Sequence, residues 1–251
     1  MLVKAMKPLG FLVIMMILTG LACLSSSETP TPELPPPSPT ELPPQPTPPE
    51  PTASPQVAEK FFTEEFDGDL SNWTYFNVLG STKANESGLS LEVVDGYLSF
   101  DITTKELYTY VIYDPFTYKD VAIELRAENL GTNNNAIGMV CRYSNEGWYE
   151  IDIQNNGLYK IFAASYDASG NVVYHSLADG GSTKIKVGKE TNEYKMGCKD
   201  RTISLYINGF ETRVLEDNQY VLPEGQVGFS VASFNDPTVK VKVDWVKISQ
   251  P

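Results

Sequence analysis

The stretch W-Y-E-I-D-I-Q-N-N-G-L-Y-K-I-F, residues 148–162, sets two alternating runs on either side of one Asn-Gly pair. Successive side chains of a β-strand point to opposite faces. This places two sets on opposite faces: Trp148, Glu150, Asp152 and Gln154 on one, and Tyr149, Ile151 and Ile153 on the other. Asn156-Gly157 is typical of a type I′ turn, whose two central residues need positive φ. The stretch therefore predicts a β-hairpin with one apolar core face and one acidic open face.

The same pattern continues through residues 59–250. Short alternating runs are separated by Gly, Asn and Asp, and helix signals are nearly absent. Asn208-Gly209 joins T-I-S-L-Y-I to F-E-T-R-V and predicts a second type I′ hairpin. About a dozen such strands predict an all-β fold, a two-sheet antiparallel jelly-roll sandwich.

The N-terminal part has a different composition. Residues 1–22 are typical of a secretory signal peptide, with Lys4 and Lys7 before a short apolar run. The following T-G-L-A-C resembles a bacterial lipobox and predicts lipidation of Cys23, with ordinary cleavage or an uncleaved anchor as alternatives. Residues 23–58 are rich in proline and predict a disordered linker with an extended, polyproline II backbone. We therefore expect an extracytoplasmic lipoprotein, held at the cell surface by its lipid anchor.

Charge and histidine content limit the partners and the chemistry. The formal net charge of −13 argues against nucleic acid as a partner, and it leaves the lipid anchor as the expected membrane contact. His175 is the single histidine, so a site with several histidine ligands is excluded. Its setting predicts a surface residue at a strand edge.

Two cysteines, Cys141 and Cys198, remain besides Cys23. Each lies in a strand-like run, and outside the cytoplasm an even pair is frequently oxidised. We predict a disulfide between them, with two buried free thiols as the alternative.

Several stretches, taken in order, resemble the concanavalin A-like lectin/glucanase superfamily. F-T-E-E-F-D-G-D-L-S-N-W at 62–73 is similar to the opening of family 16-type β-glucanases. C-R-Y-S-N-E-G-W-Y-E-I-D-I at 141–153 and E-Y-K-M-G-C-K-D-R-T-I-S-L-Y-I-N-G-F at 193–210 resemble laminin-G-like and 3-keto-disaccharide hydrolase-type domains. V-K-V-D-W-V-K-I at 241–248 resembles the last strand of the superfamily. The resemblance implies the same sandwich, with a sugar-holding concave face.

The resemblance also implies roles on the strand 148–154. Retaining glucanases carry E-I-D-I-E, with a nucleophile at the first Glu and an acid/base at the last. Here Glu150 and Asp152 fill the first two positions, but the last is Gln154. Retaining hydrolysis needs two carboxyl groups about 5–5.5 Å apart, and an amide cannot protonate a leaving group. We therefore predict a strand that holds a sugar without cleaving it.

Other outward-pointing polar residues are expected to share this face. The predicted carbohydrate site comprises Glu124, Arg126, Arg142, Trp148, Glu150 and Asp152. Carboxylates and guanidinium groups bind vicinal hydroxyls, and an indole ring can stack on a pyranose. The alternative is a solvated sheet face with cross-strand ion pairs, each worth roughly 0.2–1 kcal/mol.

A structural calcium ion is a separate expectation. The resemblance implies ligands at Asp244, through its side chain, and at Glu65 and Gly96, through backbone carbonyls. Calcium accepts such oxygen ligands with water completing the shell. The alternative is that Asp244 is an exposed strand residue or caps a turn.

The sequence leaves three functions open. The first expectation is a non-catalytic, cell-surface carbohydrate-binding module for oligo- or polysaccharides. The first alternative is a glycoside or 3-keto-glycoside hydrolase that uses Arg142, Glu150 and Asp152. The second is a laminin-G-like module that recognises another surface protein.

Overall fold

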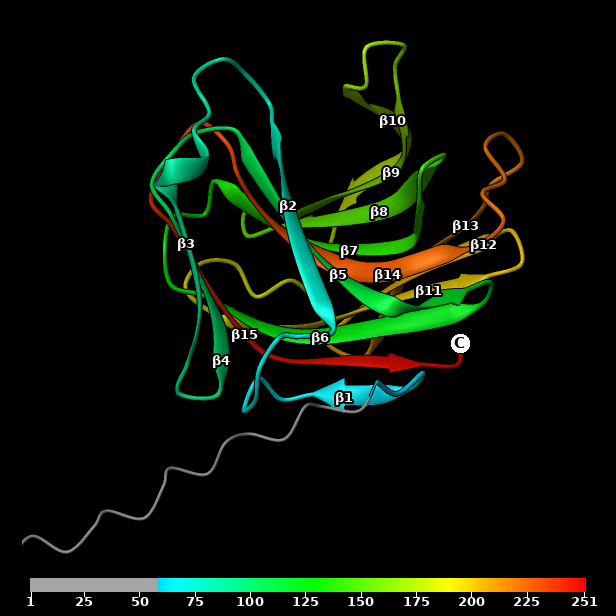
Figure 1. The fold of residues 1–251 in the computed structure, drawn as a ribbon, viewed down its shortest axis with the longest axis horizontal. Helices are drawn as coiled ribbons and strands as arrows, with labels where there is room; N and C mark the ends of the chain where they lie inside the picture. The colour runs from blue at the N-terminus through cyan, green and yellow to red at the C-terminus, as the bar shows by residue number, and fades with distance from the viewer. Residues whose placement is uncertain (1–57) are drawn as a thin grey trace, which may run out of the picture. The chain divides into compact units, whose positions relative to one another are not determined.

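The computed structural model describes residues 58–251, which form two antiparallel β-sheets packed face to face (Figure 1). The predicted signal peptide 1–22, the predicted lipidation site Cys23 and all but the last residue of the predicted linker 23–58 lie outside the described residues. Within 58–251, no helix has the length and apolar character needed to span a membrane. The all-β sandwich predicted from the alternating runs is confirmed.

The eight-stranded sheet contains the chain's last strand near its centre. In spatial order its strands are β13 (Phe210–Glu216), β12 (Thr202–Ile207), β11 (Thr191–Lys199), β6 (Val121–Asn129), β15 (Val239–Ser249), β4 (Tyr97–Ile102) and β3 (Leu89–Val94), and β1 (Phe62–Glu64) also pairs with β15. A 3₁₀ turn, η1 (Glu86–Gly88), precedes β3.

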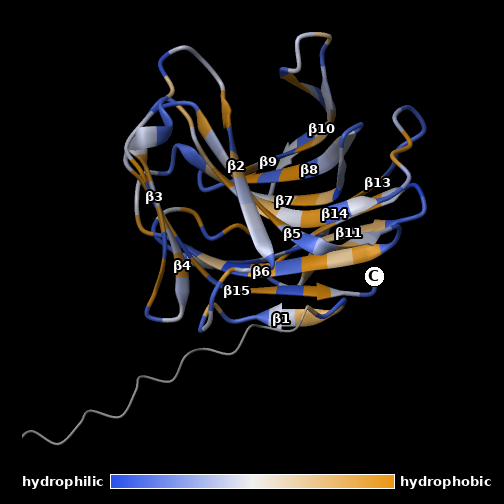
Figure 2. Ribbon diagram, in the orientation of Figure 1, coloured by the Kyte–Doolittle hydropathy of each residue, from blue (hydrophilic) through white to orange (hydrophobic). Residues whose placement is uncertain are grey.

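The seven-stranded sheet contains the stretch that opened the sequence analysis. In spatial order its strands are β10 (Val172–Gly181), β9 (Leu158–Tyr166), β8 (Gly147–Gln154), β7 (Asn135–Ser144), β14 (Gly225–Ser233), β5 (Leu107–Tyr118) and β2 (Trp73–Leu79). The central strands of both sheets are the hydrophobic ones, and the connecting loops are largely hydrophilic (Figure 2).

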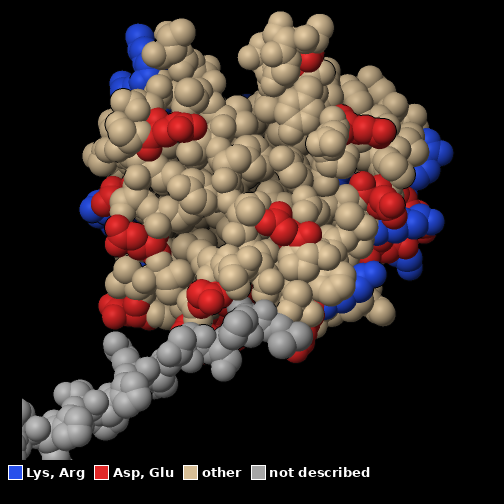
Figure 3. Space-filling model, in the orientation of Figure 1, with Lys and Arg blue, Asp and Glu red and all other residues tan. Residues whose placement is uncertain are grey.

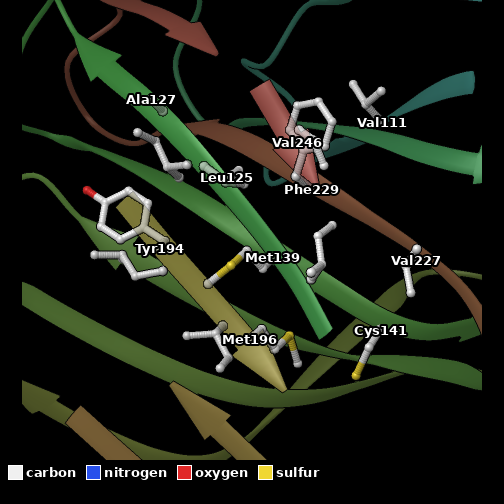
Figure 4. Close-up of a cluster of buried hydrophobic side chains, with 14 of the residues drawn as sticks. Val111, Leu125, Ala127, Met139, Cys141, Tyr194, Met196, Val227, Phe229 and Val246 are labelled. Atoms are coloured by element: carbon white, nitrogen blue, oxygen red, sulfur yellow. The ribbon is translucent and has the colours of Figure 1, made fainter. Parts of the chain in front are cut away.

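The main core fills the space between the sheets. Leu125, Tyr194 and Met196 from the eight-stranded sheet pack toward Met139 and Phe229 from the seven-stranded sheet (Figure 4). Tyr149, Ile151 and Ile153 of β8 belong to the same cluster, as their parity predicted. Apolar burial of this kind contributes roughly 25 cal/mol per Å².

A disulfide crosses this core. Cys141 on β7 and Cys198 on β11 are bonded, and their Cα atoms lie 6.7 Å apart. The bond joins the two sheets covalently at positions 57 residues apart in sequence.

The two predicted turns differ in type. Asn208 and Gly209 have φ values of 51° and 80°, which confirms the type I′ turn between β12 and β13. At the β8–β9 turn only Gly157 has positive φ, and its N–H donates to the carbonyl of Gln154 at 3.1 Å. The type I′ prediction is therefore wrong there: Asn155 and Asn156 are the central residues of a type I-like turn, and Gly157 supplies the left-handed residue that follows it.

Candidate functional site

The acidic face of β8 is directed as predicted but is not open. Trp148, Glu150 and Asp152 lie on the outer face of the seven-stranded sheet, opposite the core residues Tyr149 and Ile151. Trp148 is nevertheless 0% exposed and Glu150 only 1% exposed. The prediction that these two side chains are accessible to a sugar is therefore wrong.

The residues that cover them form an aromatic roof, defined here as Phe76, Tyr110, Tyr143, Tyr166 and Tyr174. The ring centroids of Tyr110, Tyr143 and Tyr166 lie 5.5–5.7 Å from that of Trp148, and those of Phe76 and Tyr174 lie 6.3–6.4 Å away. Edge-on and tilted ring pairs at these separations are favourable. The roof turns an outer sheet face into a second, smaller hydrophobic cluster.

One contact shows how strongly the sheet curls. The hydroxyl oxygens of Tyr110 on β5 and Tyr174 on β10 are 2.6 Å apart, although four strands separate β5 from β10 in the sheet. Side chains from strands near the two edges of the sheet therefore meet above Glu150.

Glu150 is fully engaged beneath this roof. Its carboxylate accepts hydrogen bonds from Tyr110 Oη at 2.9 and 3.1 Å, from Trp148 Nε1 at 2.9 Å and from Ser230 Oγ at 3.2 Å. Donors of this kind stabilise a buried negative charge. Because the Glu150 carboxylate is buried and fully hydrogen-bonded, a substrate cannot reach it.

Gly138 on β7 makes room for the polar cluster. A Cβ atom at this position would lie 2.1 Å from Ser230 Oγ and 3.0 Å from Asp152 Oδ1. A glycine is required because any side chain would displace the groups around Glu150.

Glu150 and Asp152 are neighbouring buried acids on the outer face of β8. Burial, and then the charge of Glu150, raise the pKa of Asp152 well above its usual value. Burial also raises the pKa of Glu150, while hydrogen bonds from Trp148, Asp152, Tyr110 and Ser230 oppose that rise. Asp152 Oδ1 is buried and has no hydrogen-bond partner among residues 58–251. Burial and the neighbouring carboxylate raise the pKa of Asp152 more strongly than that of Glu150, so of the two acids Asp152 favours its protonated form.

The raised pKa of Asp152 predicts a pH dependence of stability that Asp152→Asn reduces. Folded Asp152 keeps a proton that the unfolded residue releases above about pH 4, so wild-type stability falls as pH rises from there toward the raised folded pKa. Asparagine does not titrate, so the variant lacks the contribution of Asp152 to this fall. Melting temperatures between pH 4.5 and 8 measure the difference, with Asp179→Asn on the exposed side of β10 as the matched control. Equal slopes in wild type and Asp152→Asn would contradict the raised pKa of Asp152.

The accessible part of this face is a cleft of about 470 Å³ at the Gln154 end of β8. Its lining residues are aromatic and polar: Glu106, Tyr108, Asn134, Asp152, Gln154, Asn156, Lys160, Phe162, Tyr174, Phe234 and Asn235. The segment between β2 and β3 and the β9–β10 hairpin project on either side of a notch in the molecular surface (Figures 1 and 3). Among the six residues predicted to bind a sugar, Asp152 alone lines the cleft.

Glu124 and Arg126 do not belong to this face. Both lie on β6, in the other sheet. Arg126 Nε is 3.6 Å from Asp244 Oδ2 and 4.0 Å from Glu193 Oε1, and all three side chains are partly exposed. The prediction of one shared patch is wrong for these residues, and the alternative of a solvated face with cross-strand ion pairs describes Arg126.

The prediction that Arg142 belongs to the carbohydrate site is also wrong. It is 4% exposed, and its guanidinium donates to the carbonyls of Lys119 at 3.0 Å, Asp200 at 2.6 Å and Leu222 at 2.7 Å. Its φ of 57° and the irregular register after Cys141 turn the side chain out of the expected alternation. Arg142 therefore holds three loops together rather than a ligand.

Of the residues predicted for calcium, Asp244 lies on β15, whereas Glu65 directly follows β1. β15 pairs with β4 up to Val243 and with β1 from Val246, so Asp244 lies at the break between these partners, close in register to Glu65. Gly96 lies in the β3–β4 turn. Arg126 already engages the Asp244 carboxylate, however, and competes with a divalent ion for it. Residues 58–251 contain no group of three His, Cys, Asp or Glu placed to bind a metal. The calcium site stays a prediction, which a calcium titration of the melting temperature checks.

Two cleft residues could have been found from the hairpin register. Lys160 and Phe162 on β9 pair with Asp152 and Glu150, so they share the outer face. Tyr108 and Phe234 come from β5 and from the loop after β14, and no local pattern connects them to β8.

His175, the single histidine, lies on the edge strand β10. It is half-buried, contacts Ser165 Oγ at 3.0 Å and stacks on Tyr220.

Comparisons with known proteins agree with this architecture. No family model matches the chain, and no curated protein matches it. A galectin-like protein of unknown function from Bacillus subtilis aligns with a TM-score of 0.56 at 9% identity, over 75% of this chain and 94% of its own. A β-glucanase from Bacillus licheniformis aligns with a TM-score of 0.55 at 13% identity, over 78% and 100%. LamA from Zobellia galactanivorans, solved with laminaritriose and laminaritetraose, aligns at 0.52 and 16%, over 77% and 100%. The chain therefore has the concanavalin A-like jelly-roll fold.

Proposed function

We propose that this protein binds carbohydrate in the cleft and does not hydrolyse it by the retaining glucanase mechanism. One observation carries the second half of the proposal: the carboxylate in the nucleophile position, Glu150, is sealed under the aromatic roof. The acid/base position holds Gln154, which leaves neither half of a retaining pair able to act.

The lining of the cleft supports a sugar ligand. Tyr108, Phe162 and Phe234 provide ring surfaces for the apolar face of a pyranose. Gln154, Asn156 and the other amides present donors and acceptors that suit hydroxyl groups. A volume of about 470 Å³ lies within the usual range for small-ligand pockets.

The likeness to LamA supports β-1,3-linked glucose oligosaccharides as the first probes, because that protein was solved with laminaritriose and laminaritetraose. These probes form a panel together with mixed-linkage glucan oligosaccharides and with di-, oligo- and polysaccharides of other linkages.

The binding test compares a variant in the cleft with one outside it. Phe162→Ala removes one wall of the cleft, and we expect it to weaken binding of the best panel glycan about tenfold, or ~1.4 kcal/mol. Tyr75→Ala is the matched control, because Tyr75 is an exposed aromatic of β2 that does not line the cleft. Calorimetric titration measures both dissociation constants. The proposal fails if no panel glycan binds, or if both variants bind as the wild type does.

A third variant tests which feature would prevent hydrolysis: the missing acid at position 154 or the burial of Glu150. Gln154→Glu restores the carboxyl group of the glucanase pattern, yet we expect no hydrolysis because Glu150 stays covered. Chromatography of the bound glycan after long incubation detects any product. Turnover by this variant or by the wild type would replace the binding proposal with the hydrolase alternative.

The proposed location is outside the cytoplasm, with the protein anchored to a membrane through a lipid on Cys23. The Cys141–Cys198 disulfide supports an oxidising compartment. A protein partner at the same surface stays a prediction.

A further inference from the structure

The outer face of the seven-stranded sheet is not a continuous trough. Tyr174 reaches from β10 to the Tyr110 hydroxyl at 2.6 Å, and its ring lies 6.2 Å from that of Tyr108. Phe76, from the edge strand β2, stacks on Tyr110 and Tyr143 at 4.9 and 5.3 Å. These contacts bridge the face from β10 at one edge to β2 at the other.

The centre of the face is correspondingly closed. Ile112, Val140 and Ala164 lie beside Tyr110 and Trp148 on this face, and all five are at most 2% exposed. No sugar ring can reach the sheet at these positions without displacing the roof.

Two separate hollows remain on either side of the roof. The cleft ends against Asp152 and Tyr174. The second hollow, of about 490 Å³, is lined by residues around Tyr143, Glu146 and Glu224, and it shares no lining residue with the cleft. A ligand in the cleft therefore meets a wall at its inner end instead of a path into the second hollow.

We infer that the cleft binds the terminal ring of a saccharide, or a free mono- or disaccharide, and does not bind an internal segment of a polysaccharide. This inference rests on the proposed function. A terminal ring has one end without a glycosidic neighbour, so it fits a site closed on one side. An internal ring needs space for the chain to continue on both sides, and the aromatic roof blocks the chain at the inner end of the cleft.

The chemistry of β-1,3-glucans provides a direct test. Internal rings of these chains lack vicinal hydroxyls and resist periodate, whereas the terminal rings carry vicinal hydroxyls and are opened. The probes are laminaritriose, laminariheptaose and a long linear β-1,3-glucan, each before and after periodate treatment followed by borohydride reduction. Borohydride reduction alone opens the reducing-end ring and identifies which end is bound.

We expect dissociation constants per mole of chain to stay constant from laminaritriose to the long glucan, and to rise at least tenfold after periodate treatment. If affinity per mole instead rises with chain length and survives periodate, internal binding is shown and the inference is overturned, while the proposed function stands. If another series from the panel binds better, the per-mole comparison across chain lengths is made on that series with the same two outcomes. If no glycan binds, the proposed function fails and the inference falls with it.

Discussion

Trp148→Ala is expected to lower the free energy of unfolding by about 3–5 kcal/mol, the usual range for a large buried aromatic. Trp148 is fully buried among the rings of the aromatic roof, and its Nε1 donates to Glu150 at 2.9 Å. The substitution leaves a cavity and also removes one donor from a buried carboxylate. Urea denaturation measures the change.

The matched control is Trp245→Ala, because Trp245 is partly exposed on β15 in the other sheet. A smaller loss of stability is expected there. Trp148→Phe keeps most of the ring and removes the N–H donor, so its loss of roughly 1–3 kcal/mol reports the hydrogen bond to Glu150. If Trp148→Ala were as stable as Trp245→Ala but lost glycan binding, Trp148 would belong to the binding surface and the roof would be wrong.

Loss of the disulfide is expected to lower the free energy of unfolding by about 4 kcal/mol. Cys141 and Cys198 close a loop with a sequence separation of 57, and loop-closure entropy gives roughly that value for this length. The bond also links the two sheets directly. Denaturation of the Cys141→Ala/Cys198→Ala double variant measures the effect.

Reduced wild-type protein is the control for this measurement, because reduction breaks the bond and deletes no core atoms. Both cysteines are buried, so the double variant also loses some packing and should be somewhat less stable than the reduced wild type. Unchanged stability in the reduced wild type would show that the sheets are held by side-chain packing alone.

The burial of Glu150 changes what the E-I-D-I-Q strand means. In this protein the first carboxylate of the pattern is the centre of a buried polar cluster, in which it accepts hydrogen bonds from Tyr110, Trp148 and Ser230. A pattern that resembles a catalytic strand thus has a structural role at Glu150, and only Asp152 and Gln154, at the end of the strand, line the cleft proposed to bind a ligand.

The alternating pattern alone determined several features. It gave the strands, the Asn208-Gly209 hairpin and the opposite faces of Trp148 and Tyr149, because strand geometry fixes side-chain direction with a period of two residues. It also gave Glu124 and Arg126 their outward orientation. The cysteines in their strand-like runs predicted a bond that the structure contains.

Only the tertiary structure decided which outward faces are exposed and which residues share one. Glu124 and Glu150 both point away from the core, but they lie on different sheets, and sheet membership depends on strand pairing between distant segments. Trp148 is covered by Phe76, Tyr110 and Tyr174, which lie far from it in sequence. The period of a strand specifies the direction of a side chain, whereas the curling of a whole sheet determines what covers it.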